Sequence, residues 1–212
     1  MNARYLIIIF FVSSLIIAAG CTGRDGAELH TTPKPVQITL ESLVLNQSEV
    51  PQNFTLFESR VKNSSEVSKL AHARGWEQGF VRRFTLFIDK ERPPTEILQT
   101  ITRYPAYNTA GIAEIIEQQY RADSNMTFSN LSSPALGNNS RAFSGTVNTV
   151  VFPEPYKGNP LDSGSVGRTV QLDFIEIIFW KEDLFEVLRM TGPDSNYSTL
   201  ASLAQKAYTK IP

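Results

Sequence analysis

The stretch from Arg168 to Gly192 limits the possible folds of this chain more than any other part of the sequence. It begins with RTVQLDFIEIIFW, turns at the polar residues KED, and continues with LFEVLRMTG. Two runs rich in Val, Ile and Phe around a short polar turn are typical of a β-hairpin. Because hairpin strands are antiparallel, the sequence predicts a largely antiparallel sheet.

Four more segments have the β-branched and aromatic composition that is typical of strands. These four predicted strands are Phe54 to Val61, Trp76 to Asp89, Glu96 to Tyr104 and Arg141 to Phe152. Two other stretches, residues 122–139 and 153–167, are polar or rich in Pro and Gly and are predicted to be long loops.

Three other segments have the spacing of amphipathic helices. Residues 64–75 hold a short apolar face, and Ile112, Ile115 and Ile116 recur at helical spacing. A short helical turn is also expected within residues 39–45. The most regular stripe lies near the end of the chain. It consists of Leu200, Leu203, Ala204, Ala207 and Tyr208.

This order of elements predicts a single α+β domain over residues 38–212. We expect a mostly antiparallel sheet of about five or six strands packed with two or three helices. The element order resembles that of the PsbP/Mog1-like α+β sandwiches, including uncharacterised prokaryotic lipoproteins of that shape. The resemblance rests on element order alone, so it implies no residue roles.

The first twenty residues have the three parts of a signal peptide. Arg4 supplies a positive charge, residues 5–17 are almost entirely apolar, and small residues follow. A membrane-spanning helix needs about 20 apolar residues, so this run is short for a span. The pattern predicts a secretory signal peptide over residues 1–20.

The small residues lead to Cys21, which is the only cysteine of the chain. The segment IIAAGCTG resembles the lipobox of prokaryotic lipoproteins, although Ala18 stands where that family usually has Leu, Val or Ile. The resemblance implies cleavage before Cys21 and a diacylglycerol on its sulfur. The partner would then be the lipid bilayer, and the chain would lie on the extracytoplasmic face of the cell membrane. An ordinary secretory signal with an unmodified cysteine is the alternative.

Residues 21–37 contain few apolar groups and two prolines, which predicts a flexible tether. Without residues 1–20 the chain loses one positive charge and carries a net charge of −2. This balance gives no bulk attraction to nucleic acid, so no nucleic-acid partner is expected. With Cys21 acylated no disulfide is possible, and the domain must depend on its core.

Motifs for N-glycosylation are more frequent than chance predicts. Ser and Thr fill 36 of the 212 positions, so about two of the twelve asparagines would carry the motif by chance. Such an excess together with a lipobox resembles archaeal surface lipoproteins, whereas a bacterial lipoprotein with unused motifs is the alternative. We expect all seven motifs to lie outside the strands and helices. They begin at Asn46, Asn53, Asn63, Asn125, Asn130, Asn138 and Asn196.

The sequence offers few groups for catalysis. Its two histidines are His30, in the predicted tether, and His72, on the predicted short helix. The sequence contains no recognised metal-binding, nucleotide-binding or nucleophile motif. We therefore expect no metal, no cofactor and no catalytic residue, and we predict that the protein is not an enzyme.

Asp173 and Glu176 keep a metal-independent hydrolase open as an alternative, since paired carboxylates can hydrolyse substrates without metal. In a regular strand these two residues lie on opposite faces of the sheet. A β-bulge near Phe174 and Ile175 would instead place both acids on the outer face. We predict the bulge, or an edge position for this strand.

The stretch from Trp76 to Tyr107 carries no glycosylation motif, so a bare binding face should include it. Arg82 and Arg83 point to opposite faces of their strand. One interpretation is that these arginines form a cross-strand ion pair on the solvent face. The alternative is that one of them lies in a ligand cleft with Trp76 or Tyr104. The predicted binding face therefore comprises Trp76, Arg82, Tyr104 and Tyr107.

Together these features predict a membrane-anchored, extracytoplasmic lipoprotein. Its domain is expected to be a non-catalytic binding or structural module at the cell surface. The expected partner is a surface protein, a glycan or a small ligand. A carboxylate-dependent hydrolase and an accessory subunit of a membrane complex remain the alternatives.

Overall fold

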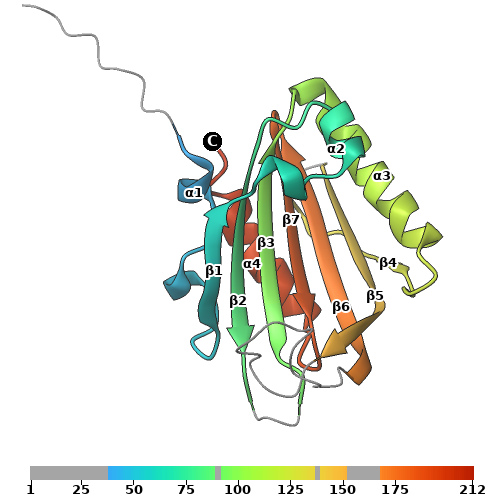
Figure 1. Cartoon of the computed structure of the whole chain (residues 1–212). Coiled ribbons are helices and arrows are strands. Elements are labelled where there is room, and N and C mark those ends of the chain that lie inside the picture. The colour runs from blue at the N-terminus through green and yellow to red at the C-terminus, as the bar shows by residue number, and fades with distance from the viewer. Residues whose placement is uncertain (1–37, 89–91, 137–138, 152–167) are drawn as a thin grey trace, which may run out of the picture. The chain divides into compact units, whose positions relative to one another are not determined.

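The computed structural model describes residues 38–88, 92–136, 139–151 and 168–212. In this part of the chain, seven strands form one sheet in the order β1-β2-β3-β7-β6-β5-β4 (Figure 1). Every neighbouring pair is antiparallel. The strands are β1 (Thr55–Val61), β2 (Gln78–Leu86), β3 (Thr95–Arg103), β4 (Ser129–Leu131), β5 (Ser140–Val151), β6 (Arg168–Lys181) and β7 (Leu184–Thr191).

Four α-helices accompany the sheet in the described ranges. The longer two are α3 (Thr109–Ala122) and α4 (Tyr197–Tyr208), and the shorter two are α1 (Leu40–Leu43) and α2 (Lys69–Ala73). Figure 1 shows α2 and α3 on one side of the sheet and α4 on the other. The predicted α+β fold with a mostly antiparallel sheet is therefore confirmed, although the sheet has one strand more than expected.

The β6–β7 hairpin lies at the centre of this architecture. Its strands pair from Phe174 with Thr191 to Lys181 with Leu184. The turn between them contains Glu182, whose φ of 53° is the left-handed geometry that two-residue hairpin turns require. Helices cover β6 on both sides, so both alternating sets of its side chains are apolar, which explains the nearly continuous apolar sequence.

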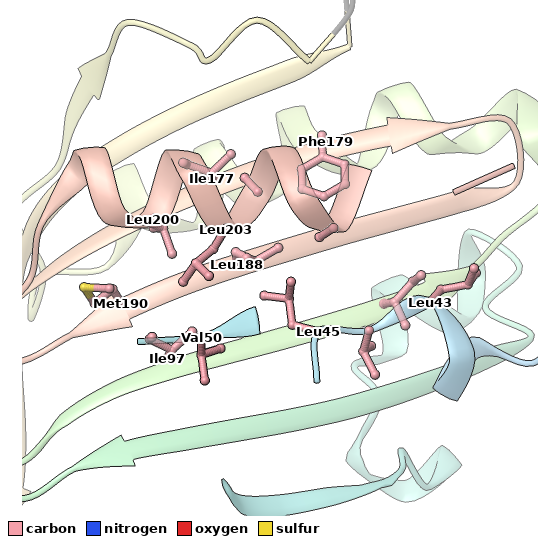
Figure 2. Packing of buried hydrophobic residues seen from close by; sticks show 14 of the residues in the cluster. Leu43, Leu45, Val50, Ile97, Ile177, Phe179, Leu188, Met190, Leu200 and Leu203 are labelled. Atoms are coloured by element: carbon pink, nitrogen blue, oxygen red, sulfur yellow. The ribbon is translucent and has the colours of Figure 1, made fainter. Parts of the chain in front are cut away.

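The sheet face toward α4, which we call the α4 face, carries the larger core (Figure 2). Phe179 and Leu188 of the hairpin meet Leu200 and Leu203 of α4, and Val50 closes the core from the N-terminal side. Each of these side chains is at most 5% exposed. The predicted apolar stripe of the last helix therefore packs directly on the sheet.

The opposite face, which we call the α3 face, has a smaller core. Helix α3 contributes only Ile112 and Ala113 as buried apolar residues. The sheet contributes aromatic and aliphatic side chains beneath them. The buried members of this second cluster are Tyr104, Ile112, Ala113, Phe143, Ile178 and Phe185.

The segment predicted as a loop over residues 122–139 contains the short edge strand β4, which pairs with β5. The chain before β4 passes very close to β5. A Cβ atom on Gly145 would lie 1.9 Å from the carbonyl oxygen of Thr127, so only glycine fits there. A three-residue strand on the edge of a sheet has too few residues for a sequence pattern, so the sequence did not predict it.

The predicted bulge near Phe174 is wrong, and so is the edge position for its strand. β6 pairs through this region with β5 on one side and β7 on the other without a change of register. Asp173 and Glu176 consequently point to opposite faces of a central strand. Asp173 is exposed, whereas Glu176 is 1% exposed.

The predicted signal peptide over residues 1–20, the lipidated Cys21 and the tether over residues 21–37 lie outside the described residues. The whole of the predicted loop over residues 153–167 does so as well. Among the helices of the described ranges, none has the length and apolar character needed to cross a membrane.

Candidate functional site

A cavity of about 180 Å³ lies on the α3 face, between the sheet and the helices α2 and α3. Strands β3 and β7 form its floor and the two helices form its walls. We call it the α3-face cavity. It is lined by Lys62, Ser68, Leu70, Ala71, Arg74, Thr100, Thr102, Tyr104, Ile112, Ile115, Ile116, Gln119, Phe185 and Val187.

Apolar side chains make up most of the cavity wall. Ile112 and Ile116 are four residues apart on α3, so they lie on the same side of the helix. Phe185 and Val187 are two residues apart on β7, so they project from the same face of the sheet. Leu70 of α2 completes the apolar lining. Such a wall favours the apolar part of a ligand.

Besides Ser68, whose hydroxyl oxygen accepts from the Ala71 amide, four hydrogen-bonding side chains interrupt this wall, namely Thr100, Thr102, Tyr104 and Gln119. No side-chain hydrogen bond joins any of them to another described residue. Tyr104 is only 6% exposed. Burial raises the pKa of Tyr104 to about 12, so its hydroxyl remains a neutral donor at physiological pH. The cavity thus holds polar groups that the fold itself does not use.

Two cations, Lys62 and Arg74, also line the cavity. Within the described ranges neither forms an ion pair or a side-chain hydrogen bond. The Arg74 guanidinium lies over α3, since a Cβ atom on Gly111 would be 3.5 Å from its Nη1 atom. The nearby Glu66 carboxylate is already paired with Arg60 at 2.6 Å. The cavity therefore has positive charge available for an anion.

A buried polar cluster lies on the same face beside the cavity. Its Tyr120 follows the cavity residue Gln119 on α3, and its Arg189 lies two residues beyond the cavity residue Val187 on β7. We call it the Glu176 cluster, and it consists of Tyr120, Glu176 and Arg189. Tyr120 donates its hydroxyl proton toward the Glu176 carboxylate, with oxygen distances of 2.8 and 2.9 Å. Arg189 donates to Glu176 from Nε at 2.7 Å and to the Tyr120 hydroxyl from Nη2.

Aromatic rings surround the Arg189 guanidinium, which lies 5.2 Å from the ring centre of Tyr120 and 5.1 Å from that of Phe174. Burial, and then the charge of Glu176, raises the pKa of Tyr120. Burial alone would lower the pKa of Arg189, but Glu176 and Tyr120 outweigh it and raise that pKa. Both oxygens of the Glu176 carboxylate are hydrogen-bonded within the cluster. The cluster therefore stabilises the fold, and Glu176 is not available as a general base.

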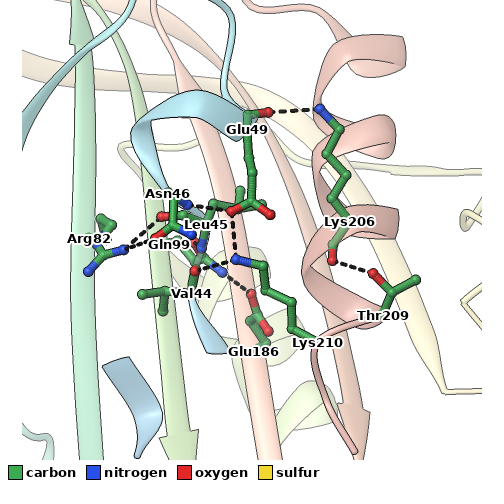
Figure 3. Close-up of polar contacts among 10 residues, drawn as sticks. All are labelled: Val44, Leu45, Asn46, Glu49, Arg82, Gln99, Glu186, Lys206, Thr209 and Lys210. Atoms are coloured by element: carbon green, nitrogen blue, oxygen red, sulfur yellow. Dashed lines mark hydrogen bonds and ion pairs between the residues drawn. The ribbon is translucent and has the colours of Figure 1, made fainter. Parts of the chain in front are cut away.

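A second polar cluster lies on the α4 face and holds the segment over residues 44–50 (Figure 3). Arg82 donates from Nη1 to the Leu45 carbonyl oxygen at 2.9 Å. The Leu45 amide donates to Oε1 of Gln99 at 2.8 Å, and Gln99 donates from Nε2 to Glu186. Backbone groups of an irregular segment need such partners when they are buried.

Lys210, which follows α4, completes this α4-face polar cluster. Its Nζ atom donates to Oε2 of Glu49 at 2.6 Å and to the Val44 carbonyl oxygen at 2.9 Å. Lys206 donates to the Glu49 carbonyl oxygen at 2.8 Å. These contacts fasten the beginning of the domain to its last helix, so the cluster serves the fold.

Glu186 is the unusual member of that cluster. It is 0% exposed, and its Oε2 atom has no hydrogen-bond partner among the described residues. Burial raises the pKa of Glu186 to about 8, against the opposing effects of Gln99 and Lys210. Glu186 is therefore mostly protonated at pH 7, and it orients the Gln99 amide toward the Leu45 backbone.

The four residues of the predicted binding face do not meet on one surface. Arg82 is buried on the α4 face, whereas Tyr104 lines the α3-face cavity. Trp76 is half-buried and packs edge-on against the ring of His72, with ring centres 5.6 Å apart. Tyr107 is 85% exposed. Of the predicted binding residues, Tyr104 is therefore the one that reaches the cavity.

The arginine pair on β2 divides between the two faces of the sheet. Whereas Arg82 contacts the α4-face polar cluster, Arg83 lies on the α3 face and pairs with Glu58 at 3.3 Å and with Glu96 at 3.5 Å. The predicted cross-strand ion pair is therefore present at Arg83. The predicted arginine in a ligand cleft with Trp76 or Tyr104 is wrong, because neither Arg82 nor Arg83 lines the cavity that Tyr104 reaches.

Asparagines of six of the seven glycosylation motifs lie in the described ranges, and all six are exposed. Asn138 lies outside the described residues. Asn130 lies within β4, so the expectation that every motif avoids strands and helices is wrong at this position. Asn196 caps α4 by accepting a hydrogen bond from the Thr199 amide at 3.0 Å. The other exposed asparagines are Asn46, Asn53, Asn63 and Asn125.

Sequence reasoning missed the cations of the cavity and the partners of the buried acids. Lys62 and Arg74 lie in short surface segments that have no recognisable pattern. Gln99 and Glu186, by contrast, are single polar residues at inward positions of apolar strands, and that irregularity was a signal available in the sequence. Throughout the described part of the chain, no cluster of three His, Cys, Asp or Glu side chains could hold a metal ion.

No protein family matches this sequence, and no similar curated sequence is found. Among solved structures, the extracellular domain of PknH from Mycobacterium tuberculosis matches with a TM-score of 0.54 and 11% identity. The match covers 82% of this chain and 97% of that domain. Human STARD10 matches with a TM-score of 0.25 and 12% identity, over 76% of this chain and 74% of that one. The likeness to the PknH domain shows a shared fold.

Proposed function

We propose that this protein is a non-catalytic, extracytoplasmic binding module that is held at the cell membrane through an acylated Cys21. The observation that carries the binding role is the α3-face cavity. Its unpartnered hydroxyls and cations lie in an apolar wall, where a ligand can use both kinds of contact. Of the partners predicted from the sequence, a small ligand suits a cavity of about 180 Å³ better than a protein or a glycan chain does.

Several features support binding rather than hydrolysis. The hydrolase alternative requires Asp173 and Glu176 to act on one substrate, but they point to opposite faces of β6. Glu176 is also fully engaged by Tyr120 and Arg189. The cavity lining contains hydrogen-bond donors and cations but no carboxylate. No particular contact favours the accessory-subunit alternative.

The location is supported by independent features of the chain. The signal-peptide pattern and the lipobox resemblance come from residues 1–21. The shared fold with an extracellular domain is compatible with the same location. The exposure of the six described motif asparagines leaves them accessible to glycosylation outside the cytoplasm.

Mass spectrometry of the full native protein, purified from its own membranes, tests this proposal. We expect a chain that begins at Cys21 and carries the mass of a diacylglycerol. Protease added to intact cells should remove the domain while leaving cytoplasmic proteins whole. An unmodified Cys21 together with protection from protease would overturn the anchored, extracytoplasmic role. Hexose-bearing peptides at the motif asparagines would decide glycosylation separately.

A further inference from the structure

The lining of the α3-face cavity combines positive charge, hydroxyl groups and apolar side chains. The two cations are Lys62, which follows β1, and Arg74, which caps the end of α2. The apolar groups of α3 and β7 form the remaining wall, and Thr100 and Thr102 contribute hydroxyls from the floor. A ligand in this cavity would therefore meet positive charge as well as apolar side chains.

We infer that the α3-face cavity binds a small amphipathic anion, namely an apolar ring or short chain that carries a carboxylate or a phosphate. This inference rests on the proposed binding function and names its ligand class. A neutral apolar molecule would leave both cations and the four polar side chains without partners. An inorganic anion would leave the apolar wall unused.

The volume of the cavity limits the size of the apolar part. Cavities of about 150 Å³ hold one benzene molecule, and this cavity measures about 180 Å³. A single ring or a chain of roughly eight carbons is therefore the expected size. A lipid with two long acyl chains does not fit within this space.

The charges around the cavity agree with an anionic ligand. Glu66, the carboxylate that Lys62 also attracts, is occupied by Arg60 through a 2.6 Å contact. Further along the same face, Glu58 and Glu96 are both paired with Arg83. These three acids are thus neutralised within the fold, whereas Lys62 and Arg74 are not.

Isothermal titration calorimetry of the full chain in phosphatidylcholine nanodiscs tests the inference, with empty nanodiscs as the blank. The probes are octanoate, its neutral counterpart octanol, and acetate as the charged group alone. We expect saturable binding of octanoate, binding of octanol that is at least about tenfold weaker, and no measurable binding of acetate, because charge-assisted hydrogen bonds are each worth about tenfold or more.

Two variants separate the charge from the apolar wall. The double variant Lys62→Gln with Arg74→Gln should weaken octanoate binding at least about tenfold while leaving octanol binding unchanged. Ile116→Trp should fill the cavity and abolish the binding of both. Lys69→Gln is the matched control, since Lys69 lies on α2 but does not line the cavity. Circular dichroism confirms that each variant is folded.

Three results would overturn the inference: absence of saturable octanoate binding, equal affinity for octanoate and octanol, or unchanged affinity in the double glutamine variant. Incubation with octyl phosphate distinguishes a failure of the proposed ligand class from a failure of the proposed non-catalytic function. If it binds and is recovered intact, both stand. If it binds and is released as octanol and inorganic phosphate, the non-catalytic role fails while the ligand class stands.

Discussion

The two faces of the sheet differ in how completely they are packed. On the α4 face, helix α4 and residues 44–50 close over a continuous core, and the polar side chains there are bonded mainly to backbone groups. On the α3 face the core is smaller, a cavity remains, and several polar side chains have no partner within the described ranges. The same strands supply both faces through alternate residues.

We infer from this difference that the α4 face mainly provides stability and the α3 face mainly provides a place for a ligand. Buried apolar area is the main source of folding stability, so the closed face should provide most of it. An incompletely packed face lowers stability but leaves groups free for a ligand. If this division holds, substitutions on the α4 face should mainly affect unfolding, and substitutions around the cavity should mainly affect binding.

The largest effect should come from the centre of the closed face. Phe179 is 0% exposed and packs against the ring of Tyr208, with ring centres 5.8 Å apart. Phe179→Ala should lower the free energy of unfolding by about 3–5 kcal/mol, because it removes a large buried side chain and leaves a cavity. Ile115 is only half-buried beside the existing cavity, so Ile115→Ala should cost less, about 1–2 kcal/mol.

Urea unfolding of the two variants measures this contrast directly. Tryptophan fluorescence can follow it, since Trp76 and Trp180 lie in the domain. Equal losses for Phe179→Ala and Ile115→Ala would contradict the division between a closed and an open face.

The next effect concerns the part of the α3 face that is closed, the Glu176 cluster. Arg189→Met should lower the free energy of unfolding by about 3 kcal/mol, because it leaves the Glu176 carboxylate buried without its cation. The double variant Arg189→Met with Glu176→Met should recover most of that loss, since it removes the buried charge as well. If the double variant is no more stable than the single one, the cluster has a role beyond compensating its own charges.

Much of the fold could be predicted from the sequence because its elements follow simple periods. The hairpin from Arg168 to Gly192 and the helix stripe at Leu200 and Leu203 are both found where expected. The bulge near Phe174 was predicted because Glu176 was assumed to avoid burial. The structure instead buries Glu176 against Arg189, a contact between strands that no local pattern reveals.

The cavity could be predicted much less well, for a physical reason. Its floor comes from β3 and β7, which are neighbours in the sheet but are about eighty residues apart in sequence. Its cations, Lys62 and Arg74, lie directly after β1 and α2. Tyr104 was predicted as a binding residue from its aromatic character, whereas the buried position of Arg82 depends on Leu45, whose backbone bonds to Arg82 of β2 and Gln99 of β3.

A smaller effect, dependent on pH, is expected on the closed face. The pKa of Glu186 is raised to about 8 in the folded protein from an ordinary value of 4.5. The folded state therefore holds a proton that the unfolded state loses between these values, so this group makes stability fall as pH rises from about 4.5 to 8.

Glu186→Gln cannot ionise, so it should lack this fall. At pH 4 the variant and the wild type should be similarly stable, and at pH 6 the variant should already be more stable by roughly 2 kcal/mol. Thermal unfolding from pH 4 to pH 8 measures the difference, with Glu77→Gln as the exposed control. Parallel pH profiles for Glu186→Gln and the wild type would contradict the protonated state of Glu186.

The smallest effect compares two threonines of the same strand and addresses the open face most directly. Thr95 is 1% exposed, and its hydroxyl bonds to the Asp194 carboxylate at 3.3 Å and accepts from the Asp194 amide at 3.2 Å. Thr102 is 5% exposed, but its hydroxyl faces the cavity without a partner among the described residues.

Thr95→Val should cost about 1 kcal/mol of unfolding free energy, whereas Thr102→Val should change it by less than about 0.5 kcal/mol. Urea unfolding of both variants, followed by octanoate titration of Thr102→Val, separates stability from binding. A loss of stability in Thr102→Val equal to that in Thr95→Val would mean that the fold depends on this hydroxyl, and the cavity would then lose one of the groups that make it available to a ligand.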